Sequence, residues 1–90
     1  MKIKLELFGA SRDFSNKDYL EFSLKEKSSI KDLRTEVLNF VENNFKGNDN
    51  YKKLVKSSAF CSEENTIVSD DYKITKEQNI GIIPPIGGGW

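Results

Sequence analysis

The feature that most constrains the fold is a change of hydrophobic period along the chain. Residues 2–8 alternate in character, with Ile3, Leu5 and Leu7 on one face and mostly charged side chains on the other. Residues 20–25 repeat this alternation, and period two is typical of half-buried strands. We therefore predict two hairpin-paired strands, with residues 9–17 as turn and loop. Across residues 30–45 the apolar side chains recur at helical spacing, which predicts one amphipathic helix.

Local signals mark the ends of this helix and the elements that follow it. Ser29 and Asp32 stand where an N-cap and its partner three residues later would stand, and Gly47 lies where a helix commonly ends. Beyond it, residues 48–50 read as loop and residues 51–56 as a short helical turn. Residues 58–61 and 66–68 predict two short strands around a polar turn, and the apolar run 80–83 predicts a buried central strand.

The order of these elements predicts the fold class. Two strands, a helix and three further strands give a mixed sheet, and a right-handed crossover would place the last strand beside and parallel to the first. This is an α+β arrangement of the β-grasp, ubiquitin-like type, with about five strands and one main helix. We predict one such domain over residues 1–83, followed by a flexible tail over residues 84–90.

Composition narrows the function classes. The chain has no histidine and a single cysteine, Cys61, so the commonest general base and a cysteine-based zinc cage are both missing. This weighs against an independent enzyme, and we interpret Cys61 as a small buried apolar residue. Fourteen basic and fourteen acidic residues balance, which argues against nucleic acid as a partner. No stretch approaches the roughly 20 apolar residues of a membrane span, and residues 2–8 do not resemble a secretory signal. We therefore expect no membrane partner and a cytoplasmic location.

The tail carries the strongest functional signal. The only two prolines, Pro84 and Pro85, directly follow the last predicted strand, and Ile86 then leads into Gly87, Gly88 and Gly89. Proline cannot donate to a ladder, so the strand must stop there, and glycines have no side chain to obstruct a narrow channel. Residues 84–89 could reach about 20 Å at ~3.3 Å per residue. Such a tail suits delivery of a carboxylate to another protein's active site, although loose glycine-rich ends are also common.

The sequence resembles the MoaD/ThiS family of sulfur carriers, and more specifically the small subunit of molybdopterin synthase. Two segments carry the resemblance: Ile82-Ile83-Pro84-Pro85-Ile86-Gly87-Gly88-Gly89, and Phe8-Gly9-Ala10-Ser11-Arg12-Asp13. The resemblance implies that a MoeB-like adenylating enzyme uses ATP to join AMP to the carboxylate of Gly89. Sulfur then replaces AMP, and the thiocarboxylate serves a MoaE-like large subunit in molybdopterin biosynthesis. It implies no cofactor bound to this chain.

Trp90 departs from the family pattern, in which the reactive glycine is terminal. Gly89 is followed here by Trp90, so its carbonyl lies in a peptide bond. Three accounts are open. A processing protease removes Trp90 from a proform; the chain is a β-grasp adaptor that no longer carries sulfur; or Trp90 is an artificial addition. A ubiquitin-like protein modifier is the alternative function, because it would use the same activated tail.

A docking surface is expected near the base of the tail. Phe8 shares the otherwise charged face of the first strand, and Ile83 alternates with Ile82, so an apolar patch should form there. We expect Phe8, Arg12 and Ile83 to contact both kinds of partner. The competing interpretation is that Phe8 curls over the edge of the core.

Overall fold

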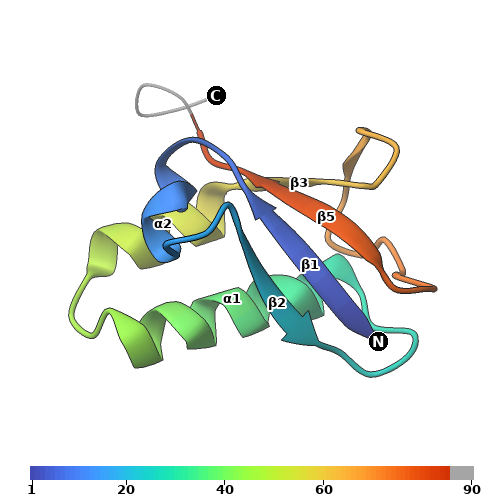
Figure 1. The fold of residues 1–90 in the computed structure, drawn as a ribbon, viewed down its shortest axis with the longest axis horizontal. Coiled ribbons are helices and arrows are strands. Elements are labelled where there is room, and N and C mark those ends of the chain that lie inside the picture. The colour runs from blue at the N-terminus through green and yellow to red at the C-terminus, as the bar shows by residue number, and fades with distance from the viewer. Residues whose placement is uncertain (86–90) are drawn as a thin grey trace.

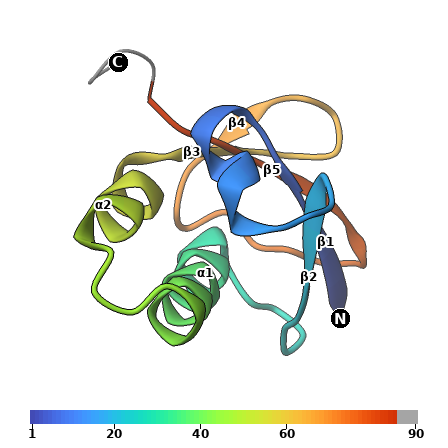
Figure 2. The ribbon, with the colours of Figure 1, turned by 60° about the vertical axis from the view of Figure 1, so that its left-hand side comes forward.

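A five-stranded mixed sheet packs one face against a helix in the computed structural model, which describes residues 1–85 (Figure 1). Its elements in chain order are β1 (Lys2–Leu7), the 3-10 helix η1 (Gly9–Phe14), β2 (Tyr19–Ser23), α1 (Ile30–Asn44), α2 (Asp49–Ser57), β3 (Ala59–Cys61), β4 (Ile67–Val68) and β5 (Gln78–Ile83). Both α-helices lie on the same side of the sheet (Figure 2).

The strand order confirms the predicted β-grasp topology. The sheet runs β2-β1-β5-β3-β4, so the last strand lies in the centre. β1 is antiparallel to β2 and parallel to β5, with Leu7 opposite Ile82. β3 is antiparallel to both β5 and β4. The tail therefore begins at the end of a strand that is held by a neighbour on each side.

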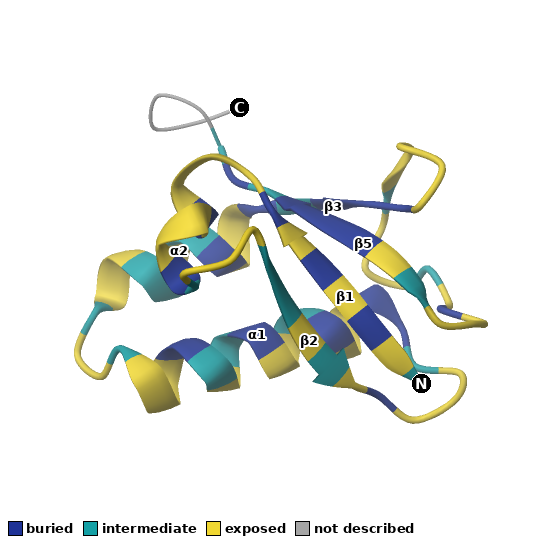
Figure 3. Cartoon of the chain, viewed as in Figure 1, coloured by how far each residue is buried: buried dark blue, intermediate teal, exposed yellow. Residues whose placement is uncertain are grey.

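The alternation in β1 matches its burial. Ile3, Leu5 and Leu7 are buried, whereas the charged residues between them are exposed (Figure 3). Ile80 and Ile82 of β5 are also fully buried, on the same side of the sheet. The side chains that α1 and α2 add to this core are Ile30, Leu33, Val37, Val41 and Val55.

The predicted capping signals hold at the start of α1. The hydroxyl of Ser29 accepts from the backbone N–H of Asp32, and the Asp32 carboxylate accepts from the backbone N–H of Ser29, at 2.8 Å. The Ser29 hydroxyl also donates to the Asp32 carboxylate, at 3.2 Å. The pKa of Asp32 is lowered from its ordinary value, first by the hydrogen bond from the Ser29 backbone N–H and then by the one from the Ser29 hydroxyl. The helix ends at Asn44, within one residue of the prediction, and Gly47 takes the left-handed backbone (φ 81°) of the turn that follows.

Two segments are more regular than the sequence predicted. Residues expected as loop after β1 form η1, because the Ser11 amide and hydroxyl both donate to the Phe8 carbonyl, the hydroxyl at 2.6 Å. The expected short helical turn is the nine-residue helix α2. Asn48 caps it by accepting from the Tyr51 N–H, and the Tyr51 ring packs edge-on against Phe14 of η1.

One arginine ties α2 to the rest of the domain. The Arg34 side chain, on α1, donates to the carbonyls of Val55 and Ser58 at 2.7 and 2.8 Å, and to the Asp70 carboxylate at 2.7 Å. Its guanidinium also lies 4.8 Å from the centre of the Phe60 ring. Arg34 thereby joins α1, the C-terminal end of α2, β3 and the loop before β5.

Candidate functional site

The base of the tail is anchored to the domain. Pro84 follows β5 directly and is buried, and Pro85 is half-buried. A methyl group built on Gly9 would lie 3.8 Å from Cδ of Pro84, so the start of η1 contacts the proline ring. Gly9 has a φ of 56°, a backbone conformation that favours glycine. The tail therefore leaves the domain at a fixed point beside η1.

Phe8 lies across the face of the sheet that the helices leave free. Its ring sits over Gly81 of β5, where an added Cβ would be 2.9 Å from the ring atom Cε2 and 2.7 Å from Sγ of Cys61. Only glycine leaves room for both neighbours at this position. Phe8 nevertheless stays 41% exposed. It rests on the outer face of the sheet as a surface residue and does not join the core.

An apolar groove lies beside the tail base. It is lined by Phe8, Cys61, Asn65, Ile67 and Ile83, and we name it the tail-base groove. Register explains the gathering, because Cys61 pairs with Gly81 and both lie on the same face as Ile83. Among the described residues, Phe8 and Ile67 are the large apolar side chains with the highest exposure, at 41% and 59%. The groove is thus an apolar surface open to solvent.

The predicted docking residues separate into two places. Phe8 and Ile83 come together in the tail-base groove, with Ile83 half-buried and Ile82 facing the core. Arg12 lies on η1, outside the groove lining, and is exposed, with its Nε donating to the Leu7 carbonyl at 3.4 Å. Whether these residues bind a partner stays a prediction. The other predicted site residues, Ile86, Gly87, Gly88, Gly89 and Trp90, lie outside the described part of the chain.

Sequence reasoning missed several contributors to this site. Ile67 was assigned only to a short strand, and Gly81 only to an apolar run. A glycine inside a strand does signal a close approach by another group, so Gly81 could have been found from the sequence. Cys61 is buried, as interpreted, and forms no disulfide, although it lines the groove instead of the main core.

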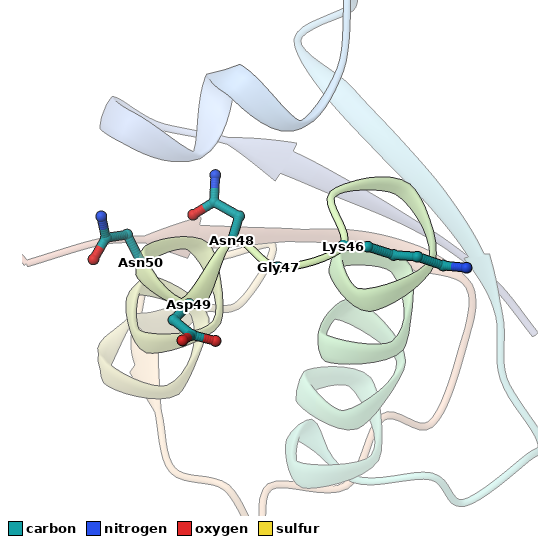
Figure 4. Close-up of a pocket in the computed structure, with 5 residues that line it drawn as sticks. All are labelled: Lys46, Gly47, Asn48, Asp49 and Asn50. Atoms are coloured by element: carbon teal, nitrogen blue, oxygen red, sulfur yellow. The ribbon is translucent and has the colours of Figure 1, made fainter.

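Other parts of the described chain provide weaker candidates for a binding site. A polar hollow at the turn between α1 and α2 is lined by residues 46–50, whose side chains point in different directions (Figure 4). No group of three or more metal-ligating side chains occurs within residues 1–85. Over the same residues, neither α-helix has the length and apolar character needed to cross a membrane.

Solved structures share this fold over nearly their whole length. No family model and no curated protein matches the sequence. SAMP1 from Haloferax volcanii matches with a TM-score of 0.70 and 12% identity, over 99% of this chain and 100% of that one. A protein from Pyrococcus furiosus described as molybdopterin converting factor, subunit 1, matches with a TM-score of 0.70 and 22% identity, over 94% and 98%. A structure named as H. volcanii small archaeal modifier protein 1 has a TM-score of 0.68 and 10% identity, over 94% and 98%. The chain therefore has the ubiquitin-like β-grasp fold that these proteins share.

Proposed function

We propose that this protein is a ubiquitin-like sulfur carrier for molybdopterin biosynthesis. The observation that carries the proposal is the glycine-rich tail, which follows the central strand β5 and starts beside the exposed tail-base groove. In this proposal a MoeB-like enzyme adenylates the carboxylate of Gly89 with ATP. A MoaE-like large subunit then receives the sulfur. Cleavage after Gly89 by a processing protease removes Trp90 first.

The chemistry places few demands on the carrier itself. A carboxylate is a poor electrophile, so an oxygen of Gly89 attacks the α-phosphate of ATP and pyrophosphate leaves. Hydrosulfide (HS⁻) from a sulfide donor then attacks the acyl carbon and AMP leaves, which gives the thiocarboxylate without any change of oxidation state. The partner enzyme supplies ATP and the catalytic groups for both steps. This chain supplies the acyl group on a narrow arm, which is consistent with its lack of histidine.

The geometry of the tail base supports this role. Pro84 is buried against η1, so a partner that contacts the groove finds the start of the arm in a fixed position. From Pro84 to Gly89 the arm spans up to about 20 Å at ~3.3 Å per residue, enough to enter a deep channel. Fixing the base removes conformational freedom that binding would otherwise have to remove. The printed description of the P. furiosus structure, a molybdopterin converting factor subunit, favours the same pathway.

The test is mass spectrometry of a chain ending at Gly89. Incubated with a cognate adenylating enzyme, ATP and a sulfur donor, it should exchange one terminal oxygen for sulfur. A chain ending at Gly88 is the matched control and should exchange less, because its carboxylate lies one residue short. If ATP is consumed and the mass of the longer chain never changes, the carrier proposal fails.

A ubiquitin-like modifier is the second candidate, favoured by the name of the matching H. volcanii structure. A modifier would join its glycine carboxylate to lysine side chains of other proteins. Tryptic peptides from cell extracts would then carry the glycine tail in isopeptide linkage. Finding such conjugates without any thiocarboxylate would replace the first proposal by the second.

A further inference from the structure

We infer that the tail-base groove is the binding site for the chain's own Trp90 indole. The groove presents the two most exposed large apolar side chains of the described residues, Phe8 and Ile67. Its remaining walls are Ile83, the Cys61 thiol and Asn65. An aromatic ring system with one polar N–H suits such a lining, because its apolar body covers apolar side chains and the Asn65 side-chain oxygen can accept from the N–H.

The size of the groove suits one aromatic side chain. Its volume is about 300 Å³. That is at the lower end of the roughly 300–1,000 Å³ of pockets that hold small ligands. The lack of a side chain at Gly81 leaves room for both the ring of Phe8 and the thiol of Cys61, which line this groove.

The length of the tail permits the contact. Trp90 lies five residues beyond Pro85. Five residues reach at most about 17–18 Å at 3.3–3.6 Å each. The residues that line the groove come from the β1, β5, β3 and β4 side of the sheet. These four strands are separated by three spacings of roughly 4.8 Å, so the groove is about 14 Å wide across the sheet. One wall, Ile83, is only two residues before Pro85, so every part of the groove lies within reach.

The sequence between these points allows the chain to turn back. Glycine can adopt positive φ as readily as negative φ, so no side chain would resist a reversal at Gly87, Gly88 or Gly89. A short flexible linker also gives an effective concentration in the range of about 1 mM. A Kd of indole for the groove below about 1 mM is therefore enough to keep the groove more than half occupied. As long as Trp90 is attached, a second copy or another protein must compete with this tethered ligand.

Occupancy by Trp90 has a consequence that rests on the proposed function. If partners dock on the groove, Trp90 blocks that surface as well as the carboxylate of Gly89. Removing this residue would then expose the docking surface and the reactive carboxylate in a single cleavage. The contact itself does not depend on sulfur chemistry and can be measured without it.

Fluorescence gives a direct test, because Trp90 is the only tryptophan. In the full chain its emission should be shifted to shorter wavelength than in a free peptide of residues 86–90, and acrylamide should quench it less. The protection should not change on dilution. Ile67→Glu places a charge in the groove and should return emission and quenching to those of the peptide. Asn79→Glu, at an exposed site on β5 outside the groove, should leave both unchanged.

Each other outcome overturns the inference. Quenching equal to that of the free peptide would show that the indole stays in solvent. Protection lost on dilution would assign the groove to a second copy. Protection that survives Ile67→Glu, with the fold verified by circular dichroism, would place the indole elsewhere. A positive result combined with no thiocarboxylate in the mass-spectrometry test would uphold this contact and reject only the carrier proposal.

Discussion

Replacing Gly81 by alanine tests the packing on which the tail-base groove depends. The new methyl carbon would lie 2.7 Å from Sγ of Cys61 and 2.9 Å from Cε2 of Phe8. Favourable contacts between carbon atoms lie at about 3.5–4.0 Å. Phe8 can swing outward because its ring is 41% exposed, whereas Cys61 is only 9% exposed and sits in a paired strand. The clash with the thiol is therefore the harder one to relieve.

The expected magnitude follows from two opposing effects. Overpacking a well-filled site destabilises by about 1–3 kcal/mol. Removing glycine's freedom in the unfolded chain stabilises by about 0.4–1 kcal/mol. The net loss should be about 1–2 kcal/mol in the free energy of unfolding. With a urea slope near 1 kcal/mol/M, at the low end for small domains, the midpoint should fall by about 1–2 M.

Urea denaturation followed by circular dichroism measures this loss, and a double-mutant cycle identifies its cause. Cys61→Ala removes the sulfur atom that the new methyl group meets. Gly81→Ala should therefore destabilise less in that background, with a coupling of more than about 0.5 kcal/mol. An unchanged midpoint for Gly81→Ala, together with strict additivity in the cycle, would show that Phe8 and Cys61 do not pack over Gly81 as described.

Four further predictions follow, one from the tail, one from the groove and two from the helix cap. The full chain should support no ATP–pyrophosphate exchange with a cognate adenylating enzyme, whereas a chain ending at Gly89 should support it. The reason is that adenylation needs a free glycine carboxylate. Equal exchange by both chains would show that Trp90 does not have to be removed. In a chain ending at Gly89, Phe8→Ala should weaken binding of the adenylating enzyme and of the MoaE-like subunit by more than about 1 kcal/mol each in calorimetry, as for a buried interface aromatic. Unchanged affinity for both would mean that the groove is not the docking surface. Ser29→Ala should lose about 1 kcal/mol of stability with the N-cap. The Asp32 carboxylate has a folded pKa below its ordinary 3.8, so its contribution is present above that pH and is lost as the pH falls through the folded pKa. The difference in urea midpoint between the natural chain and Asp32→Asn should therefore shrink in acid, and a constant difference would contradict the assigned cap.

The elements that sequence predicts well are those whose signals are local. The alternation of residues 2–8, the cap at Ser29 and the strand stop at Pro84 each depend on neighbours within a few positions, and the structure has β1, α1 and β5 there. The strand order also follows from the order of elements and the handedness of crossovers.

The features that sequence reasoning missed depend on contacts between distant segments. The length of α2 depends on Tyr51 meeting Phe14, 37 positions earlier, and on Arg34 reaching the Val55 carbonyl. The groove depends on the register that places Cys61 opposite Gly81. A glycine inside a strand signals that some group approaches closely, but it does not say which one. Phe8 could therefore be assigned to the outer face from its alternation, whereas its contact with Gly81 and Cys61 could not be predicted.

The parallel pairing of β1 with β5 also determines how the domain responds to force. Met1 precedes the start of β1 and the tail follows the end of β5, so the two ends leave opposite ends of adjacent parallel strands (Figure 1). Tension between them loads the register pairs from Ile3–Gln78 to Leu7–Ile82 in shear, all at once instead of one after another. Forced unfolding is governed by the unfolding rate, which this geometry should keep low. A pull on the tail against a tethered Met1 should therefore leave the domain folded.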